Sequence, residues 1–272
     1  MKVKRLCTAI AGTFLTIGLI VGSSSTVKSY AYTEIEVTDG GNITGTVTLE
    51  GDIPPVKMLN VDSDTHLCVH THGKTPSQAL IVSKDTNGIK NVVVSIENIE
   101  KGKKLAPSNS NPELNQKGCE EKGGEKGPSN SNPALNQKDC EFIPHILVVP
   151  AGSKIDILNE DEVLHNVHTY AIKNSPINIA VLYGSKVCKR FMFPEIVRVK
   201  CDVHKWMSAY IVVKDNPYFA VTDENGNFKI DNVPAGTYKL QAWQETLENQ
   251  VKDVTVAAGN EVKIDFKFTA TK

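Results

Sequence analysis

Several motifs that would identify an enzyme or a haem protein are missing from this 272-residue chain. It contains no Cys-x-x-Cys-His motif, so it cannot hold haem covalently, and any cytochrome would be a separate partner. Serine-nucleophile elbows, phosphate-binding glycine loops and the His-Glu-x-x-His zinc motif are also absent. These absences argue against a hydrolase.

The chain also has little net charge and only one long apolar run. Residues 1–31 start with basic residues, continue with an apolar run to about Val21, and predict a secretory signal peptide cleaved after Ala31. Its removal takes away four basic residues and no acidic ones, which changes the net charge from −1 to −5 and makes nucleic acid an unsuitable partner. We therefore expect a periplasmic or otherwise exported protein with no membrane span in the mature chain, unless an uncleaved leader anchors it.

Four side chains offer the donor atoms of a mononuclear copper site. Cys201, His204 and Met207 supply a thiolate, an imidazole and a thioether within the string CDVHKWM, and His165 in LHNVH supplies a second imidazole. This ligand set is that of trigonal copper electron-transfer sites, whereas zinc would more usually take a second thiolate or a carboxylate. The loop holds no second cysteine, so a binuclear centre is not expected.

The residues before this loop alternate in a way that predicts a strand. In FPEIVRVKC, period 2 places Val197, Val199 and Cys201 on one face, so we expect the sulfur to point into the core. The apolar run SAYIVVKD predicts a further strand directly after the loop.

On these residues the chain resembles the cupredoxins, which include plastocyanin and amicyanin. The resemblance covers about residues 140–214, where a Phe-x-Pro start, a Pro-x-Gly turn and a His-Asn pair follow in order, and the short ligand loop is like that of amicyanin. It implies a Greek-key β-sandwich with one type 1 copper ion bound by His165, Cys201, His204 and Met207. It also implies that Asn166 braces the ligand loop.

By the same likeness, the protein is an electron carrier and not an enzyme. The edge of the His204 ring would pass single electrons to a redox protein such as a c-type cytochrome or a periplasmic oxidoreductase. Similar chains are often labelled methylamine utilisation protein, a pathway that these residues do not establish. Two alternatives remain open: a periplasmic copper carrier or buffer, and a structural module without a redox role.

Other histidines bear on these alternatives. In an extended chain, one face of the segment HLCVHTH would carry His66, Cys68, His70 and His72, which could bind a second metal ion. A second ion there would favour the copper carrier. His168 follows His165 by three residues and is expected on the opposite face of the strand. The role of His145 stays open.

Five cysteines remain after the leader is removed, an odd number that fits one metal thiolate and up to two disulfides. The expected disulfide joins Cys68 to Cys140, because each ends a segment that flanks a predicted insert. That insert, residues 101–139, contains a tandem duplication in which PSNSNPELNQKGC returns after 21 residues as PSNSNPALNQKDC. Its composition of Pro, Ser, Asn, Gly and Lys predicts a flexible loop.

Residues 215–272 resemble a second all-β domain, the carboxypeptidase regulatory-like, transthyretin-like sandwich, on the stretch VTDENGNFKIDNVPAGTYKLQAW. The leading strand of such a domain is missing there, but a similar one lies at residues 41–51. We therefore expect the N-terminal β region, residues 33–100, to be the first half of a discontinuous sandwich around the cupredoxin core, residues 140–214. The alternative is a plain series of domains in which the strand at 90–99 begins the cupredoxin.

Overall fold

The computed structural model describes residues 32–68, 73–105 and 132–270, all within the unit Tyr32–Lys272. The predicted signal peptide, His70, His72 and the first copy of the repeat lie outside the described residues. The all-β fold is confirmed, because the described part of the chain has a single short helix, α1 (Thr65–Cys68). No helix in this part is long and apolar enough to cross a bilayer.

The strands are, in chain order, β1 (Thr33–Glu34), β2 (Gly41–Glu50), β3 (Met58–Asn60), β4 (Lys74–Pro76), β5 (Val93–Ile96), β6 (Lys101–Gly102), β7 (Ala134–Lys138), β8 (Glu141–Ile143), β9 (Ile146–Pro150), β10 (Ser153–Asn159), β11 (His165–Tyr170), β12 (Asn178–Val181), β13 (Lys186–Phe191), β14 (Glu195–Lys200), β15 (Ser208–Lys214), β16 (Phe219–Val221), β17 (Asn227–Val233), β18 (Gly236–Trp243), β19 (Gln250–Val256), β20 (Glu261–Lys263) and β21 (Phe266–Thr269).

Strands β7 to β15 form the central sandwich. One sheet has the order β13-β10-β7-β8 and the other the order β12-β11-β14-β15-β9. Along β14, Val197 and Val199 are buried while Ile196 and Arg198 are exposed, which is the alternation that the sequence predicts. Cys201 follows directly and is also buried, so its sulfur lies in the core between the two sheets.

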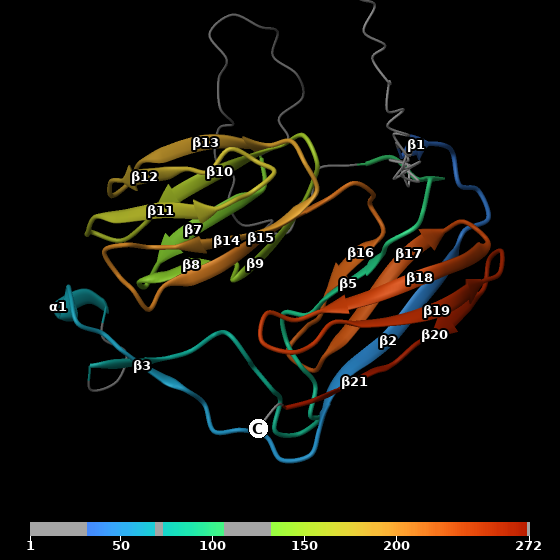
Figure 1. Cartoon of the computed structure of the whole chain (residues 1–272), viewed down its shortest axis with the longest axis horizontal. Helices are drawn as coiled ribbons and strands as arrows, with labels where there is room; N and C mark the ends of the chain where they lie inside the picture. Colours follow the sequence, from blue (N-terminus) through green and yellow to red (C-terminus); the bar gives the residue numbers. More distant parts are fainter. Residues whose placement is uncertain (1–31, 69–72, 106–131, 271–272) are drawn as a thin grey trace, which may run out of the picture. The chain divides into compact units, whose positions relative to one another are not determined.

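Strands from both ends of the sequence form the split sandwich. β2 lies between β17 on one side and β20 and β21 on the other, and β5 lies between β16 and β18. In Figure 1 the blue β2 and the green β5 are flanked by orange and red strands. β5 lies within residues 90–99, which the alternative assigned to the start of the cupredoxin. It pairs in the split sandwich instead.

Two local expectations are wrong. Residues 134–138, part of the predicted flexible insert, form β7, which is hydrogen-bonded on both sides by β10 and β8. Leu135 and Gln137 of this strand are fully buried. Backbone pairing and the burial of Leu135 offset the conformational entropy that this polar segment loses when it becomes ordered. Residues 65–68 form α1 and not an extended chain, so His66 and Cys68 do not alternate along one face as expected.

Candidate metal centre

Three neighbouring elements of the central sandwich position the predicted ligands. β11 begins with His165 and pairs antiparallel with β14, and the loop 201–207 joins β14 to β15. The loop is short because β14 and β15 are themselves antiparallel neighbours, paired as far as Lys200 and Ser208. The loop residues therefore return to the point where β11 starts.

The structure brings His165, Cys201 and His204 together. One donor atom from each lies within 4.8 Å of the other two, and all three residues are buried. The Nδ1 atoms of the two histidines are 2.8 Å apart, and the sulfur of Cys201 is 3.7 Å from Nδ1 of His204. The same nitrogen of each ring thus faces the thiol.

A carboxylate holds the other nitrogen of each ring. Nε2 of His165 lies 2.8 Å from Oδ2 of Asp161, and Nε2 of His204 lies 2.8 Å from Oδ2 of Asp64. A carboxylate accepts hydrogen bonds, so both Nε2 atoms carry hydrogen and both rings present the Nδ1 side to Cys201. Carboxylate partners of this kind orient imidazoles that bind metals.

This donor set fits a metal cation. The short contact between the two Nδ1 atoms requires a proton between two nitrogens whose lone pairs would otherwise face each other. Burial lowers the pKa of His165 and of His204, but hydrogen bonds with Cys201 and with the carboxylates outweigh it and raise both pKa values. A cation at this position would replace the proton and satisfy both lone pairs and the thiolate.

The environment of Cys201 favours its thiolate. Burial raises the pKa of the thiol, but hydrogen bonds with His165 and His204 and with two backbone N–H groups outweigh burial and lower the pKa to about 6. The backbone N–H groups are those of Asn166 and His204, at 3.5 and 3.4 Å from the sulfur. A thiolate near neutral pH binds a metal without having to lose a proton.

We expect the thiol of the metal-free protein to titrate with a midpoint of about pH 6 instead of the usual value of about 8.5. Since the pKa is lowered in the folded state, the thiolate adds stability above the usual pKa, and this contribution is lost as the pH falls through the lowered pKa. Ultraviolet absorbance of the thiolate against pH measures the midpoint, with Cys201→Ser as the control that lacks the step. A midpoint at or above about 8.5 would contradict this environment.

Two further predicted site residues, Met207 and Asn166, and the neighbouring Trp206 lie around this cluster. Met207 is buried in the same core cluster as Cys201, and its carbonyl oxygen accepts a hydrogen bond from the Cys201 N–H at 3.4 Å. Asn166 is hydrogen-bonded to the backbone N–H and to the side chain of Asp202, so it joins β11 to the ligand loop. Trp206 packs 5.0 Å from the ring of His204 and donates to the carbonyl oxygen of Cys140.

His204 is fully buried, because Asp64 of a distant segment covers Nε2. His168 lies outside the cluster and faces Asp202, whereas His145 is buried with Nδ1 3.0 Å from the Ser208 carbonyl and with Nε2 bonded to Glu245.

The cysteines divide between the site and disulfides. Cys68 and Cys140 are joined, as expected from the sequence, and Cys188 is also disulfide-bonded. Cys201 is the free thiol of the described residues. Since Cys68 is in a disulfide and His66 is exposed, the segment around α1 presents no thiolate for a second ion.

Sequence reasoning missed the two carboxylates. Asp161 precedes His165 by four residues, in the acidic run NEDE, and that proximity was a usable signal. Asp64 is 140 residues away from His204 and offers no such signal, because only the tertiary fold brings it to the ring.

A protein-family model for polysaccharide lyase family 4, domain II, matches residues 173–264. This match covers parts of both sandwiches, and it is not the carboxypeptidase regulatory-like family that residues 215–272 resemble in sequence. No curated protein matches the chain.

Similar solved structures include copper proteins. A purple cupredoxin from Nitrosopumilus maritimus is 18% identical, with 30% of this chain and all of that one covered, at a TM-score of 0.27. A mutant of amicyanin in its reduced Cu(I) form is 18% identical over 30% of this chain and 81% of that one, with a TM-score of 0.29. The copper-containing nitrite reductase from Thermus scotoductus is 19% identical, at 40% and 28% coverage and a TM-score of 0.32.

Proposed function

We propose that this protein is an exported electron carrier with one type 1 copper ion bound by His165, Cys201, His204 and Met207. The observation that carries the proposal is the buried cluster in which two Nδ1 atoms and one thiol sulfur face one another. A copper ion bound there would take up and release one electron. Imidazole and thiolate donors with a nearby thioether are the set that suits such an ion.

The surrounding residues keep the donors in one arrangement. Strand pairing fixes the chain on both sides of the loop, and the carboxylates of Asp161 and Asp64 fix the rotation of the two rings. Because all three donor residues are buried, water is kept away from the site. Ligands that move little between two charge states favour fast electron transfer.

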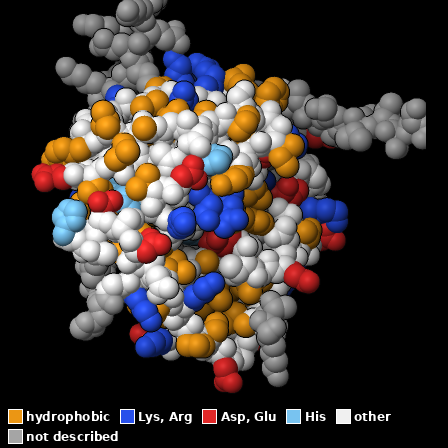
Figure 2. Space-filling model, turned by 60° about the vertical axis from the view of Figure 1, so that its left-hand side comes forward, with side chains coloured by type: hydrophobic (Ala, Val, Ile, Leu, Met, Phe, Trp, Pro, Cys, Tyr) orange, Lys and Arg blue, Asp and Glu red, His pale blue; other side chains and the backbone are white. Residues whose placement is uncertain are grey.

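Two features support the expected location. The Cys68–Cys140 disulfide suits an oxidising compartment, as the predicted signal peptide does. The partner we propose is a redox protein such as a c-type cytochrome or a periplasmic oxidoreductase. The face shown in Figure 2 mixes hydrophobic, acidic and basic side chains. This face therefore does not favour a partner whose surface is mainly acidic or mainly basic.

The split sandwich is proposed as a scaffold. Within the described ranges, both groups of three or more close His, Cys or acidic donors include His165 and belong to the central sandwich. The split sandwich therefore supplies no donor cluster of its own in this part of the chain.

The test is to add Cu(II) to the purified mature chain, residues 32–272, and to record visible absorption and electron paramagnetic resonance spectra. We expect an intense thiolate-to-copper absorption band that disappears in Cys201→Ser and persists in His168→Ala, since His168 lies outside the donor cluster. A strong band retained in Cys201→Ser would overturn the assignment. One tightly held ion per chain supports electron transfer, whereas additional exchangeable copper would support a carrier.

A further inference from the structure

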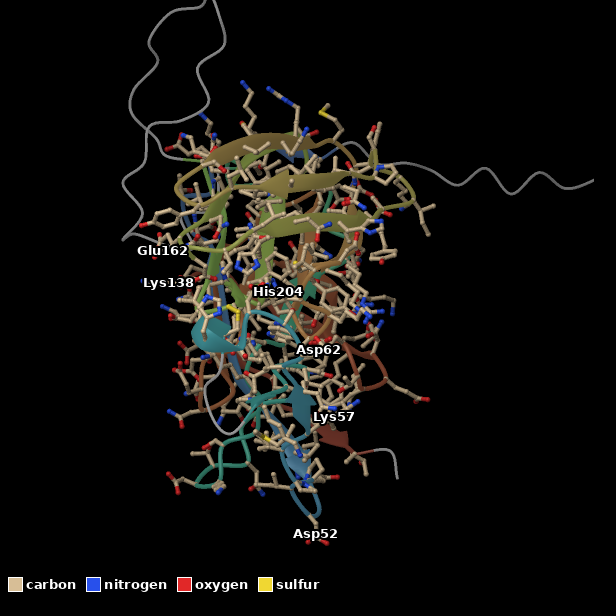
Figure 3. All side chains as sticks on the ribbon, turned by 90° about the vertical axis from the view of Figure 1, so that its left-hand side faces the viewer. Asp52, Lys57, Asp62, Lys138, Glu162 and His204 are labelled. Atoms are coloured by element: carbon tan, nitrogen blue, oxygen red, sulfur yellow. A yellow bond between two sulfur atoms is a disulfide. The ribbon has the colours of Figure 1, made fainter. Side chains whose placement is uncertain are left out.

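A segment of the N-terminal half covers the ligand loop, and we call it the cap. It consists of residues 58–68 and 73–76, with β3 paired to β4 and with α1 between them. In sequence the cap lies between β2 and β5 of the split sandwich, but Val61 and Cys68 are buried in the core cluster of the central sandwich. Figure 3 shows His204 beside the blue-green segment that also carries Asp62.

The cap contacts the ligand loop at two consecutive loop residues. Oδ2 of Asp64 lies 2.8 Å from Nε2 of His204, and the hydroxyl of Ser63 donates to the carbonyl oxygen of Val203 at 3.3 Å. The side chain of His204 is 0% exposed and that of Asp64 is 33% exposed, so Asp64 takes the place that water would otherwise have on this ring.

Little within the cap itself holds Asp64 in place. Asp64 adopts a left-handed backbone conformation (φ 45°), and its carbonyl oxygen accepts hydrogen bonds from the N–H groups of Leu67 and Cys68. These bonds start α1, which has four residues and is too short to be stable on its own. The position of Asp64 therefore depends on what anchors the cap on either side of it, which is the burial of Val61 in the core cluster of the central sandwich and the attachment of the end of α1.

The covalent anchor is the Cys68–Cys140 disulfide, which joins the last residue of α1 to the central sandwich. The N–H of Cys140 donates to Oδ2 of Asp161 at 2.8 Å, the same oxygen that accepts from His165. Each half of the disulfide is thus hydrogen-bonded to one of the two aspartates that hold the imidazoles: Cys140 to the carboxylate of Asp161, and Cys68 to the backbone carbonyl of Asp64.

We propose that Asp64 is a positioning residue for His204 and that the Cys68–Cys140 disulfide keeps it in place. The proposal rests on the proposed function in that His204 is taken as a metal ligand. A dithiol reductant would convert the disulfide into two thiols while it forms a disulfide itself, and the anchor of the cap would then be lost. Formation of this disulfide is therefore part of building the site.

The test uses the metal-free full mature chain and nitrogen-15 NMR of the histidine rings, with the His204 signals assigned by their loss in His204→Gln. In the wild type we expect a slowly exchanging Nε2–H of His204. We expect Asp64→Ala to increase its exchange rate with water at least tenfold and Asp64→Asn to restore slow exchange, because an amide oxygen still accepts the bond. Asp62→Ala, which removes an exposed carboxylate two residues away, should change nothing.

The disulfide is tested with the double variant Cys68→Ser and Cys140→Ser, in which we expect the same fast exchange of the His204 Nε2–H. If this variant does not fold, Asp64→Ala and Asp64→Asn decide the role of Asp64, and wild-type protein treated with a dithiol reductant decides the role of the disulfide. The control is untreated Cys188→Ser, which loses only the other disulfide and is expected to keep slow exchange. Slow exchange in Asp64→Ala would overturn the positioning role, and slow exchange after reduction would overturn the tether. Since no copper is added, a failed copper titration would remove the proposed function without touching these results.

Discussion

Replacing Asp161 by alanine lowers the free energy of unfolding by about 3 kcal/mol. The carboxylate is buried and accepts three hydrogen bonds, from Nε2 of His165 and from the backbone N–H groups of Asp139 and Cys140. Alanine leaves all three donors without this acceptor inside the protein, and an unsatisfied buried donor costs about 1 to 3 kcal/mol. Chemical denaturation at neutral pH measures the loss.

The matched control for this variant is Glu162→Ala, which removes the next carboxylate in the chain. Glu162 is exposed, so its removal changes stability by no more than about 0.5 kcal/mol. Equal stability of Asp161→Ala and wild type would show that the carboxylate does not hold this part of the site.

The effect of Asp161 also depends on pH. Burial raises the pKa of its carboxyl group, but the hydrogen bonds from His165, Cys140 and Asp139 outweigh burial and lower the pKa. A lowered pKa means that the stabilisation is present above the ordinary value of about 3.9 and is lost as the pH falls through the lower, folded-state value. The part of the stability difference between wild type and Asp161→Ala that comes from ionisation of this carboxyl group therefore stays constant down to about pH 4 and shrinks in stronger acid.

Residues 215–272, produced as a separate fragment, stay unfolded. This fragment keeps β16 to β21 but lacks β2, which pairs with β17, β20 and β21, and β5, which pairs with β16 and β18. It also lacks Ile43, Val47, Val94 and Ile96, which are fully buried in the same core. Strands without their central partners have neither backbone pairing nor a closed core.

Circular dichroism and proton NMR dispersion of the fragment measure this outcome. Addition of a second fragment, residues 32–105, supplies β2 and β5 and is expected to restore strand structure. A cooperative thermal transition of residues 215–272 alone would show that they form a separate domain and that β2 and β5 are dispensable.

Sequence patterns predicted the parts of this protein that local periodicity controls. The alternation before Cys201 places the sulfur inside, and the apolar run after Met207 is β15, because burial on one face of a strand requires period 2. The all-β class follows from the same patterns.

The sequence did not reveal features that depend on distant segments. β7 has a polar composition, and its stability comes from pairing with β10 and β8. The burial of His204 depends on Asp64, which no spacing rule connects to a loop 140 residues later. The likeness to the cupredoxins covers about residues 140–214 and leaves the cap out, so it gave no sign of this contact.

The register of β2 has a consequence for the order in which the chain acquires structure. Thr46 pairs with Asn227, and Val47 pairs with Phe266, so this strand is synthesised long before the strands that complete its sheet. The central sandwich lies entirely between them in the sequence and has all its strands first. Until those strands are synthesised, β2 has two open edges, and an unpaired strand is prone to aggregation or to pairing with another chain. A nascent chain that stops before residue 227 would leave it in that state permanently.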